Sequence, residues 1–425
     1  MLDAMPLLQQ SLAPGTLPSA TAISVIFALT YCGIALGHVP GLRLNRTGIA
    51  LLGAIAVMVV SRIPTRTVVS FIDWPTILLL FGFFVLSAQL RLSGFFDWAA
   101  AALARELDRP ARFLLTLMVV VAALSAFLNH DIVCFVFAPV VGTALLRKHL
   151  NPVPFLVALA IASNIGAAAT IVGNGQDMMI AEVAGLSFGP YLAWSIVPVV
   201  LSLAAAYAII WRLSRHSLAT GADAPDEPPL DPTPLDRAHT IKGLVILAVV
   251  IGLFFTLIPK ELVALAAAGI HLASPKFRTE DLLAKVDWPI LVLFAALFVV
   301  TGAFQSTGYG DRAVASLARA GVDLHSPAVL AIATATLSNL VNNSAAALLL
   351  VKVVNVTQPT TAYVLALANS FGGSLIVIGS VSNIIVVQQA RELGVSISFR
   401  SFARIGVPVT LACLAILLAW IALGV

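Results

Sequence analysis

Charged residues are scarce in this chain of 425 residues. Asp, Glu, Lys and Arg together make up 10% of it, against about a quarter in soluble domains. Hydrophobic residues make up 60%, and the mean hydropathy is +1.01. Apolar runs of about twenty residues, the length that an α-helix needs to cross a bilayer, recur from one end to the other. The composition therefore predicts an all-α polytopic membrane protein.

Cysteine is also rare. The three cysteines are isolated in apolar stretches, which favours neither a disulfide framework nor a CxxC metal site. Walker A and HExxH motifs are missing, so we expect no ATPase or zinc-protease site in this chain. The net charge of +4 comes from basic residues that stand singly at the ends of apolar runs, a pattern typical of membrane orientation rather than nucleic-acid binding. We expect no metal, no organic cofactor and no nucleic-acid partner.

One polar stretch divides the chain almost in half. Residues 214–240, which include "RHSLATGADAPDEPPLDPTPLDRAHT", are rich in Pro, Asp and Ala and are typical of a soluble linker. Residues 1–19 contain no Lys or Arg, so they lack the basic start of a cleavable signal. We expect them to form a short extracytoplasmic N-terminus before a retained first helix.

The two halves, residues 20–213 and 241–425, are similar in sequence. "DWPTILLLFGFFVLSAQLRLSGFFD" in the first half aligns with "DWPILVLFAALFVVTGAFQSTGYGD" in the second. "ALSAFLNHD" aligns with "TLSNLVNNS", and "LAIASNIGAAATIVGNGQD" with "LALANSFGGSLIVIGSVSN". Because these matches occur in the same order, we interpret the halves as an internal duplication.

Each repeat is predicted to contain five transmembrane helices and one re-entrant hairpin. The hairpins are expected over about 113–147 and 326–355, where two apolar arms, each short for a full crossing, flank a polar tip. Helices broken by Gly and Asn near the midplane follow, over about 153–186 and 361–391. Because five is odd, the second repeat has the inverted topology, which is typical of secondary transporters.

The distribution of basic residues orients this topology. Six of the 24 Lys and Arg residues fall on the side of the two termini: Arg62, Arg66, Lys260, Arg312, Arg319 and Lys352. The others fall on the side of the linker, which the positive-inside rule assigns to the cytoplasm. We therefore expect a multi-pass protein of the cytoplasmic (inner) membrane with a cytoplasmic linker and extracytoplasmic N- and C-termini.

Four polar breaks in the apolar pattern occupy matching positions of the two repeats. In lipid, backbone groups leave a helix only where protein or a watery cavity surrounds them, so paired breaks indicate a solute site near the midplane. The predicted solute-binding residues are Asn129, Gly173, Asn174, Ser338, Asn339, Asn342, Asn343, Gly379, Ser380 and Asn383. Their amide, hydroxyl and backbone groups suit a small polar solute. Four other polar residues are expected to pack helices together: Ser163, Asn164, Thr170 and Asn369.

Ionisable groups occur at the breaks of the first repeat only. Asp131 and His130 lie at the first hairpin tip, where the second repeat has Ser344 and Asn343. Inside a membrane such residues are functional by default, and in an apolar environment a carboxyl and an imidazole can exchange protons near neutral pH. We predict that Asp131 couples transport to protons with His130 as its helper, and Asp177 is the rival candidate. Alternatively, Asp131 only accepts N–H bonds from its hairpin tip.

The motif order resembles that of the ion transporter superfamily. It consists of the "NHD" tip, "SNIGAAATIVGNGQDMMIA", "LSNLVNNS" and "GSVSNIIVV", and the resemblance covers about residues 20–424. The superfamily includes ArsB-type arsenite permeases, sodium/proton antiporters of the NhaD type, and citrate or divalent-anion symporters. The resemblance implies a scaffold that holds a mobile domain of hairpins and broken helices. It also implies that the residues of the four breaks line the site.

The first tip distinguishes between members of this superfamily. Its carboxylate symporters tend to carry Ser-Asn-Thr at both tips and Pro-Pro-Asn at the break, where this chain has Asn129-His130-Asp131 and Asn174-Gly175-Gln176-Asp177. The Asn-Asp pair is closer to the ArsB-type permeases. These export neutral trihydroxy arsenic or antimony against protons.

The sequence thus predicts a secondary transporter for arsenite or antimonite efflux by proton antiport, with elevator-type alternating access. The main alternative is a sodium- or proton-coupled transporter of di- or tricarboxylates or other anions. A membrane-embedded hydrolase that uses His130 and Asp131, and a passive channel, are further alternatives. Membrane lipid is an expected partner, and a homodimer and a soluble ATPase on the cytoplasmic face stay open.

Overall fold

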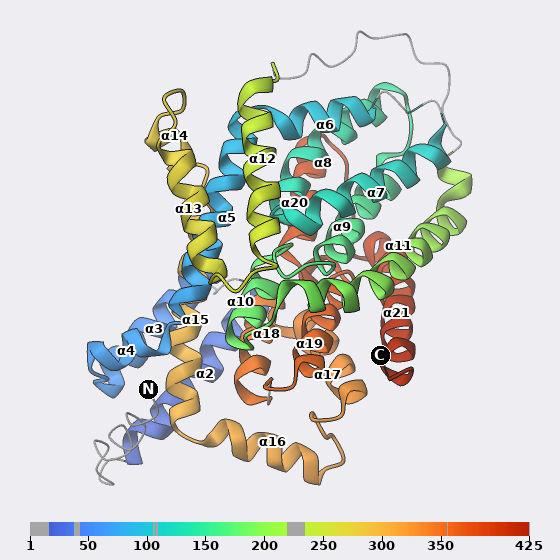
Figure 1. The fold of residues 1–425 in the computed structure, drawn as a ribbon. Helices are drawn as coiled ribbons and strands as arrows, with labels where there is room; N and C mark the ends of the chain where they lie inside the picture. Colours follow the sequence, from blue (N-terminus) through green and yellow to red (C-terminus); the bar gives the residue numbers. More distant parts are fainter. Residues whose placement is uncertain are drawn as a thin grey trace.

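A computed structural model describes residues 17–37, 43–104, 107, 109–218, 234–354 and 356–424. Within these ranges the chain forms α-helices and one short 3₁₀ helix, and no strand (Figure 1). The predicted all-α fold class with two inverted repeats, re-entrant hairpins and broken helices is confirmed. The expected extracytoplasmic N-terminus, apart from its last three residues, and most of the expected linker lie outside the described residues.

Six of the described helices are long and apolar enough to cross a membrane. They are α5 (Trp74–Leu92), α7 (Pro110–Phe127), α8 (His130–Arg147), α11 (Phe188–Leu218), α15 (Trp288–Ser306) and α21 (Phe399–Ala422). The arms of the first hairpin, α7 and α8, are among them with 18 residues each, so the expectation of short arms is wrong for this hairpin. The second hairpin has shorter arms, α17 (Pro327–Val341) and α18 (Asn343–Val353).

The remaining helices are shorter. In the first repeat they are α2 (Leu17–Leu36), α3 (Arg46–Ser61), α4 (Thr65–Phe71), α6 (Phe95–Ala104), α9 (Pro152–Ala167) and α10 (Gly175–Val183). In the second repeat they are α12 (Arg237–Leu253), α13 (Lys260–Leu272), α14 (Thr279–Leu283), α16 (Tyr309–Arg319), α19 (Pro359–Gly372), the 3₁₀ helix (Val377–Gly379) and α20 (Val381–Glu392).

Matching sequence in the two repeats produces matching local structure. Asp73 caps α5 by accepting a hydrogen bond from the backbone N–H of Thr76 (2.9 Å), and Asp287 caps α15 in the same way through Ile290 (3.3 Å). In both helices Trp-Pro follows the cap, where the missing N–H of proline costs nothing. Figure 1 shows α6 and the first hairpin toward one end of the molecule, and α16 and the second hairpin toward the other. The two repeats are therefore inverted.

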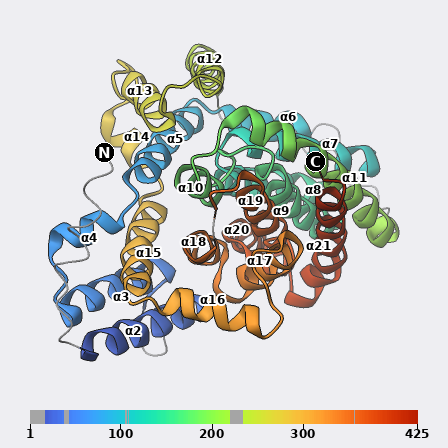
Figure 2. The same ribbon diagram turned by 60° about the horizontal axis from the view of Figure 1, so that its bottom comes forward.

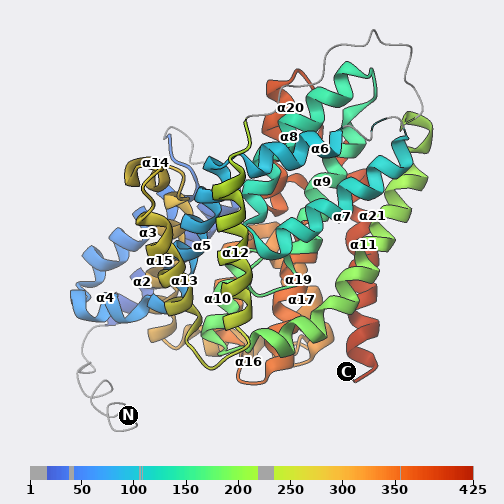
Figure 3. The same cartoon turned by 45° about the horizontal axis from the view of Figure 1, so that its top comes forward.

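The helices gather into two bundles (Figures 2 and 3). The scaffold bundle contains α2 to α5 and α12 to α15, and in it α5 packs on α13 while α15 packs on α3. The helix that begins with Asp-Trp-Pro in each repeat thus packs on the second helix of the other repeat. The hairpin bundle contains the two hairpins, the broken helices α9–α10 and α19–α20, and the long helices α11 and α21, which pack together.

The start of α12 ties the second repeat to the first. The backbone N–H of Asp236 donates to the carbonyl of Ser93 (2.9 Å), and the Gln89 side chain donates to the carbonyl of His239 (2.7 Å). Asp236 also caps α12 by accepting a hydrogen bond from the backbone N–H of His239, and it pairs with Lys276. The hydrogen bonds from the Lys276 ammonium and the His239 backbone hold the pKa of Asp236 well below its usual range. This contact lies at the end of the polar stretch, residues 214–240, that separates the repeats.

A glycine holds each hairpin against the broken helix that follows it. Gly166 of α9 lies so close to the backbone of Ala122 in α7 that a Cβ would overlap it. Gly372 of α19 approaches Ala335 in α17 in the same way, with 2.7 Å between a built Cβ and the Ala335 Cα. The two pairs occupy matching positions of the repeats. Between membrane helices such close backbone approach supplies van der Waals attraction that the hydrophobic effect does not.

We expect Gly166→Val and Gly372→Val each to destabilise the protein by about 1–3 kcal/mol, because the added side chain forces the hairpin off the broken helix. Thermal unfolding of the purified protein in detergent measures the effect. Gly269→Val is the matched control, since a Cβ at Gly269 meets nothing within 4 Å. Equal melting temperatures for all three variants would contradict the role of these contacts.

Candidate functional site

Every residue predicted for solute binding or proton coupling is buried in the structure. These residues lie at or beside the N-terminal ends of α8, α10, α18 and α20, or in the last turn of α17. All four helix starts belong to the hairpin bundle. Their free N–H groups carry partial positive charge, and this charge favours negatively charged or electron-rich groups nearby.

The two hairpin tips are built alike. The Asn129 side chain accepts a hydrogen bond from the backbone N–H of Asp131 (2.8 Å), and Asn342 accepts one from Ser344 (2.9 Å). The tips differ in backbone conformation, because Asn342 has φ +90°, a region that favours glycine. Strain of this kind is typical of functional sites, where the surrounding structure enforces it.

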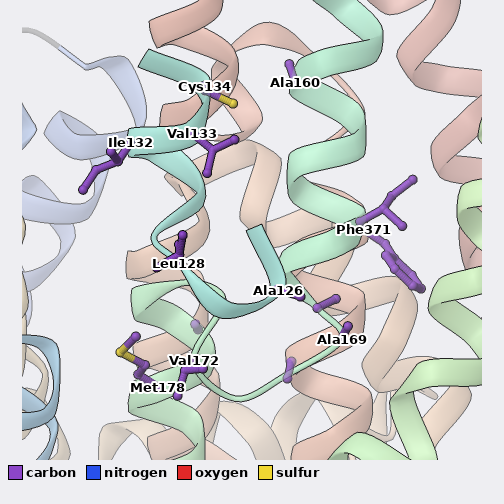
Figure 4. Close-up of a cluster of buried hydrophobic side chains, with 14 of the residues drawn as sticks. Ala126, Leu128, Ile132, Val133, Cys134, Ala160, Ala169, Val172, Met178 and Phe371 are labelled. Atoms are coloured by element: carbon purple, nitrogen blue, oxygen red, sulfur yellow. The ribbon is translucent and has the colours of Figure 1, made fainter. Parts of the chain in front are cut away.

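Each tip rests on the break of its own repeat. In the first repeat the backbone N–H of His130 donates to the carbonyl of Gly173 (3.4 Å), and the Thr170 hydroxyl donates to the carbonyl of Ala126. Figure 4 shows the apolar side chains that enclose this tip, with Cys134 directed toward α9. In the second repeat the Asn339 side chain donates to the carbonyl of Gly372 (2.7 Å), and its oxygen lies against Gly379.

Asp131 and His130 form a pair at the first tip. The distance between His130 Nε2 and Asp131 Oδ1 is 3.5 Å, and both side chains are buried. Asp131 Oδ1 and the other ring nitrogen, His130 Nδ1, have no hydrogen-bond partner among the described residues. The pair can therefore accept a proton or a hydrogen bond from a solute without breaking an internal hydrogen bond.

Asp177 lies in a different hydrogen-bonded network. Its Oδ2 accepts hydrogen bonds from the Asn174 side chain (2.7 Å) and from the hydroxyl of Ser370 in α19 (3.2 Å). The neighbouring Gln176 donates to the Ser344 hydroxyl at the second tip (2.8 Å). In the part of the chain that the structure describes, no hydrogen bond or ion pair joins Asp177 to Asp131. The first repeat thus has two separate carboxyl centres.

Two contacts between the repeats are related by the duplication. Ser370 donates to Asp177, and at the matching positions Asn164 donates through its amide to Asn383 Oδ1 (2.9 Å). Asn164 was expected to pack helices together, and Ser370 is not among the residues predicted from the sequence. The repeat alignment could have predicted that the two contacts are related, because in it Asn164 matches Ser370 and Asp177 matches Asn383.

The site has little positive charge. Among the described residues no Lys or Arg side chain is buried, and the ionisable groups at the four breaks are Asp131, His130 and Asp177. No cluster of three His, Cys, Asp or Glu side chains that could hold a metal ion occurs in the described ranges. Amides, hydroxyls and helix N-termini dominate, and they can bind a small polar solute by hydrogen bonds.

Comparison with known proteins agrees with this architecture. The family profile described as "Citrate transporter" matches residues 25–365. An uncharacterized transporter of Mycobacterium tuberculosis is 32% identical over 400 residues, which cover 88% of this chain and 92% of that protein. A silicon efflux transporter of Oryza sativa is 25% identical over 481 residues, covering 95% and 98%.

A solved structure shows the same fold. The YdaH transporter of Alcanivorax borkumensis, described as having an unusual topology, superimposes with a TM-score of 0.61 at 14% identity, over 96% of this chain and 98% of that one. The family profile covers well over half of the chain, and the mycobacterial similarity covers most of it. This protein is therefore a multi-pass membrane transporter that belongs to the citrate transporter family of the ion transporter superfamily.

Proposed function

We propose that the protein exports an uncharged metalloid hydroxide, trihydroxy arsenic or antimony, in exchange for protons. The observation that carries this proposal is the chemistry of the buried centre, where two carboxyl groups stand among amides and hydroxyls without a buried Lys or Arg in the described residues. A multiply charged anion would meet like charges there. A neutral hydroxide can donate and accept hydrogen bonds with Asn and Ser side chains.

The rice relative supports the same class of solute. It is named a silicon efflux transporter, and it aligns with nearly the whole of this chain. In neutral water silicon and trivalent arsenic are both uncharged hydroxides of similar size. We infer that the polar breaks of this chain bind such a solute without a metal or an organic cofactor.

In the proposed mechanism Asp131 carries the transported proton, and His130 at 3.5 Å tunes its exchange. Proton binding to Asp131 alternates with solute binding, so that inward proton flow drives outward solute flow. Asp177 is the rival proton carrier. Its Oδ1 also has no hydrogen-bond partner in the described chain, although Oδ2 is held by two donors.

The proposed motion is a shift of the hairpin bundle against the scaffold bundle, as in an elevator. Their boundary includes an ion pair between Glu182 of α10 and Lys260 of α13 (3.4 Å). Nearby, Gly175 lies against the apolar side chains of Leu80 and Phe294. Hydrogen bonds from Tyr31 to the carbonyl of Ala345 (3.3 Å) and from Gln305 to the carbonyl of Lys352 also cross this boundary, so sliding breaks a small number of polar contacts.

Asp131→Asn is expected to abolish uphill arsenite accumulation in everted vesicles under an imposed pH gradient, with at least a tenfold loss of rate. An amide cannot exchange the proton, but it preserves the size and hydrogen bonding of the tip, so arsenite exchange without a gradient should persist. Asp311→Asn is the control, because Asp311 is exposed on α16. A variant that still pumps at the wild-type rate removes Asp131 from the coupling step and directs the same assay to Asp177→Asn.

A carboxylate such as citrate is the second candidate solute. The description of the matching family profile and the partial positive charge of four helix N-termini at the breaks favour it. Sodium is the alternative coupling ion.

Flux measurements with one vesicle preparation separate the two solutes and the two ions. We expect arsenite accumulation that follows the pH gradient, is unchanged by a sodium gradient, and resists competition by citrate. Citrate accumulation without arsenite accumulation would replace the proposed solute, and dependence on sodium would replace the proposed ion. Vesicles without the protein provide the background.

The proposed orientation has the linker in the cytoplasm and the two termini outside. We expect a membrane-impermeant maleimide to label Arg62→Cys in intact cells and Ala224→Cys in everted vesicles only, in a background where the exposed Cys32 is changed to Ser. Labelling of both positions from the same side would contradict the inverted repeats on which the site depends.

A further inference from the structure

Asn369 of α19 is a buried amide that the site described above does not use. Asn369 is 1% exposed, and neither its Nδ2 nor its Oδ1 has a hydrogen-bond partner among the described residues. Buried polar groups are normally hydrogen-bonded, because an amide without a partner keeps the full cost of leaving water. A buried amide with both ends free therefore indicates a missing partner.

In the first repeat, the residue at the position that matches Asn369 has a hydrogen-bond partner within the protein. The position that matches Asn369 is Ser163 of α9, whose hydroxyl accepts a hydrogen bond from the Cys134 thiol in α8 (3.1 Å). The position of the second hairpin that matches Cys134 is Ala347, which has only a methyl group. The first repeat thus satisfies this contact internally, and the second repeat places a larger polar side chain at a position without an internal partner.

Helix geometry directs Asn369 toward the second hairpin. Gly373 follows Asn369 by four residues and so lies on the same face, one turn closer to the break. A Cβ built on Gly373 would lie 2.6 Å from the Asn343 amide nitrogen, so this face points at α18. Asn343 Oδ1 is also buried without a hydrogen-bond partner in the described chain. The Asn369 amide and the Asn343 oxygen therefore share one face of the α18–α19 contact, about one turn apart.

We propose that Asn369 is a solute-binding residue, and that the hydroxylated solute binds between α18 and α19 with hydroxyl groups paired to Asn369 and Asn343. This inference rests on the proposed function and specifies its solute site. An amide offers a donor and an acceptor, and a hydroxyl offers the same, whereas a carboxylate only accepts. Paired amides therefore select a hydroxide over an anion.

The proposed site gives the two repeats different roles. The solute contacts of the second repeat are uncharged amides, and the proton contacts of the first repeat are Asp131 and His130. Binding and coupling then depend on different repeats, which are held together by the contacts of Asn164 with Asn383 and of Ser370 with Asp177.

Thermal unfolding of the purified protein, with and without arsenite, tests this assignment. Asn369→Leu has nearly the same size without polar atoms, so the melting temperature without solute should stay the same or rise. The arsenite concentration needed to raise the melting temperature should increase at least about tenfold, because a hydrogen bond to the solute is lost. Asn369→Ala is the second variant, and Ser163→Ala at the matching position is the control that keeps the wild-type response.

Two results would overturn the inference. One is an Asn369→Leu or Asn369→Ala protein that responds to arsenite at the wild-type concentration. If the melting temperature of that protein without solute also falls, Asn369 has a structural role only, and the inference is again overturned. The other is a Ser163→Ala protein that loses the response equally. Failure of the proposed function appears instead in the wild-type protein, which then shows no arsenite response, and this outcome removes the solute from Asn369 as well.

Discussion

The structure depends on one constraint: in lipid, every backbone N–H and C=O group needs a partner from the protein. The chain breaks its helices at four places within the apolar pattern, and side-chain amides satisfy the exposed ends. Asn174 accepts from the backbone N–H of Asp177 (2.7 Å), and Asn383 donates to the carbonyls of Gly373 (2.7 Å) and Ile376 (3.0 Å). The side chains that satisfy the broken helix ends are thus among those that we propose for solute binding.

The duplication preserves geometry more than chemistry. The glycine contacts of Gly166 and Gly372, and the capping of both hairpin tips by asparagine, are the same in the two repeats. Ionisable groups, in contrast, occupy the breaks of the first repeat only. The proposed coupling of two fluxes needs two kinds of contact, and unequal repeats on a symmetric frame offer both.

Much of the fold follows from local patterns in the sequence. The Asp-Trp-Pro starts at Asp73 and Asp287 and the polar triplet after Leu128 are short motifs, and the structure places a cap or a chain reversal at each. The arms of the first hairpin were predicted too short, because α7 already begins at Pro110 and the polar tip residues His130 and Asp131 belong to α8. Asn164 was expected to pack helices together, and it donates to Asn383 of the other repeat, but the sequence did not show this partner because one polar residue in an apolar helix has the same local pattern whatever it contacts.

The sequence alone determined that this chain is a membrane protein of two inverted repeats with four polar breaks, because hydrophobicity, capping motifs and repetition are local or additive properties. Only the tertiary structure decided which polar groups meet. It joined Asn164 to Asn383 across 219 residues, and among the described residues it left Asp131 without a hydrogen bond to Asp177 and Asn369 without a hydrogen-bond partner. These outcomes depend on how distant helices pack against one another, and no local pattern encodes that packing.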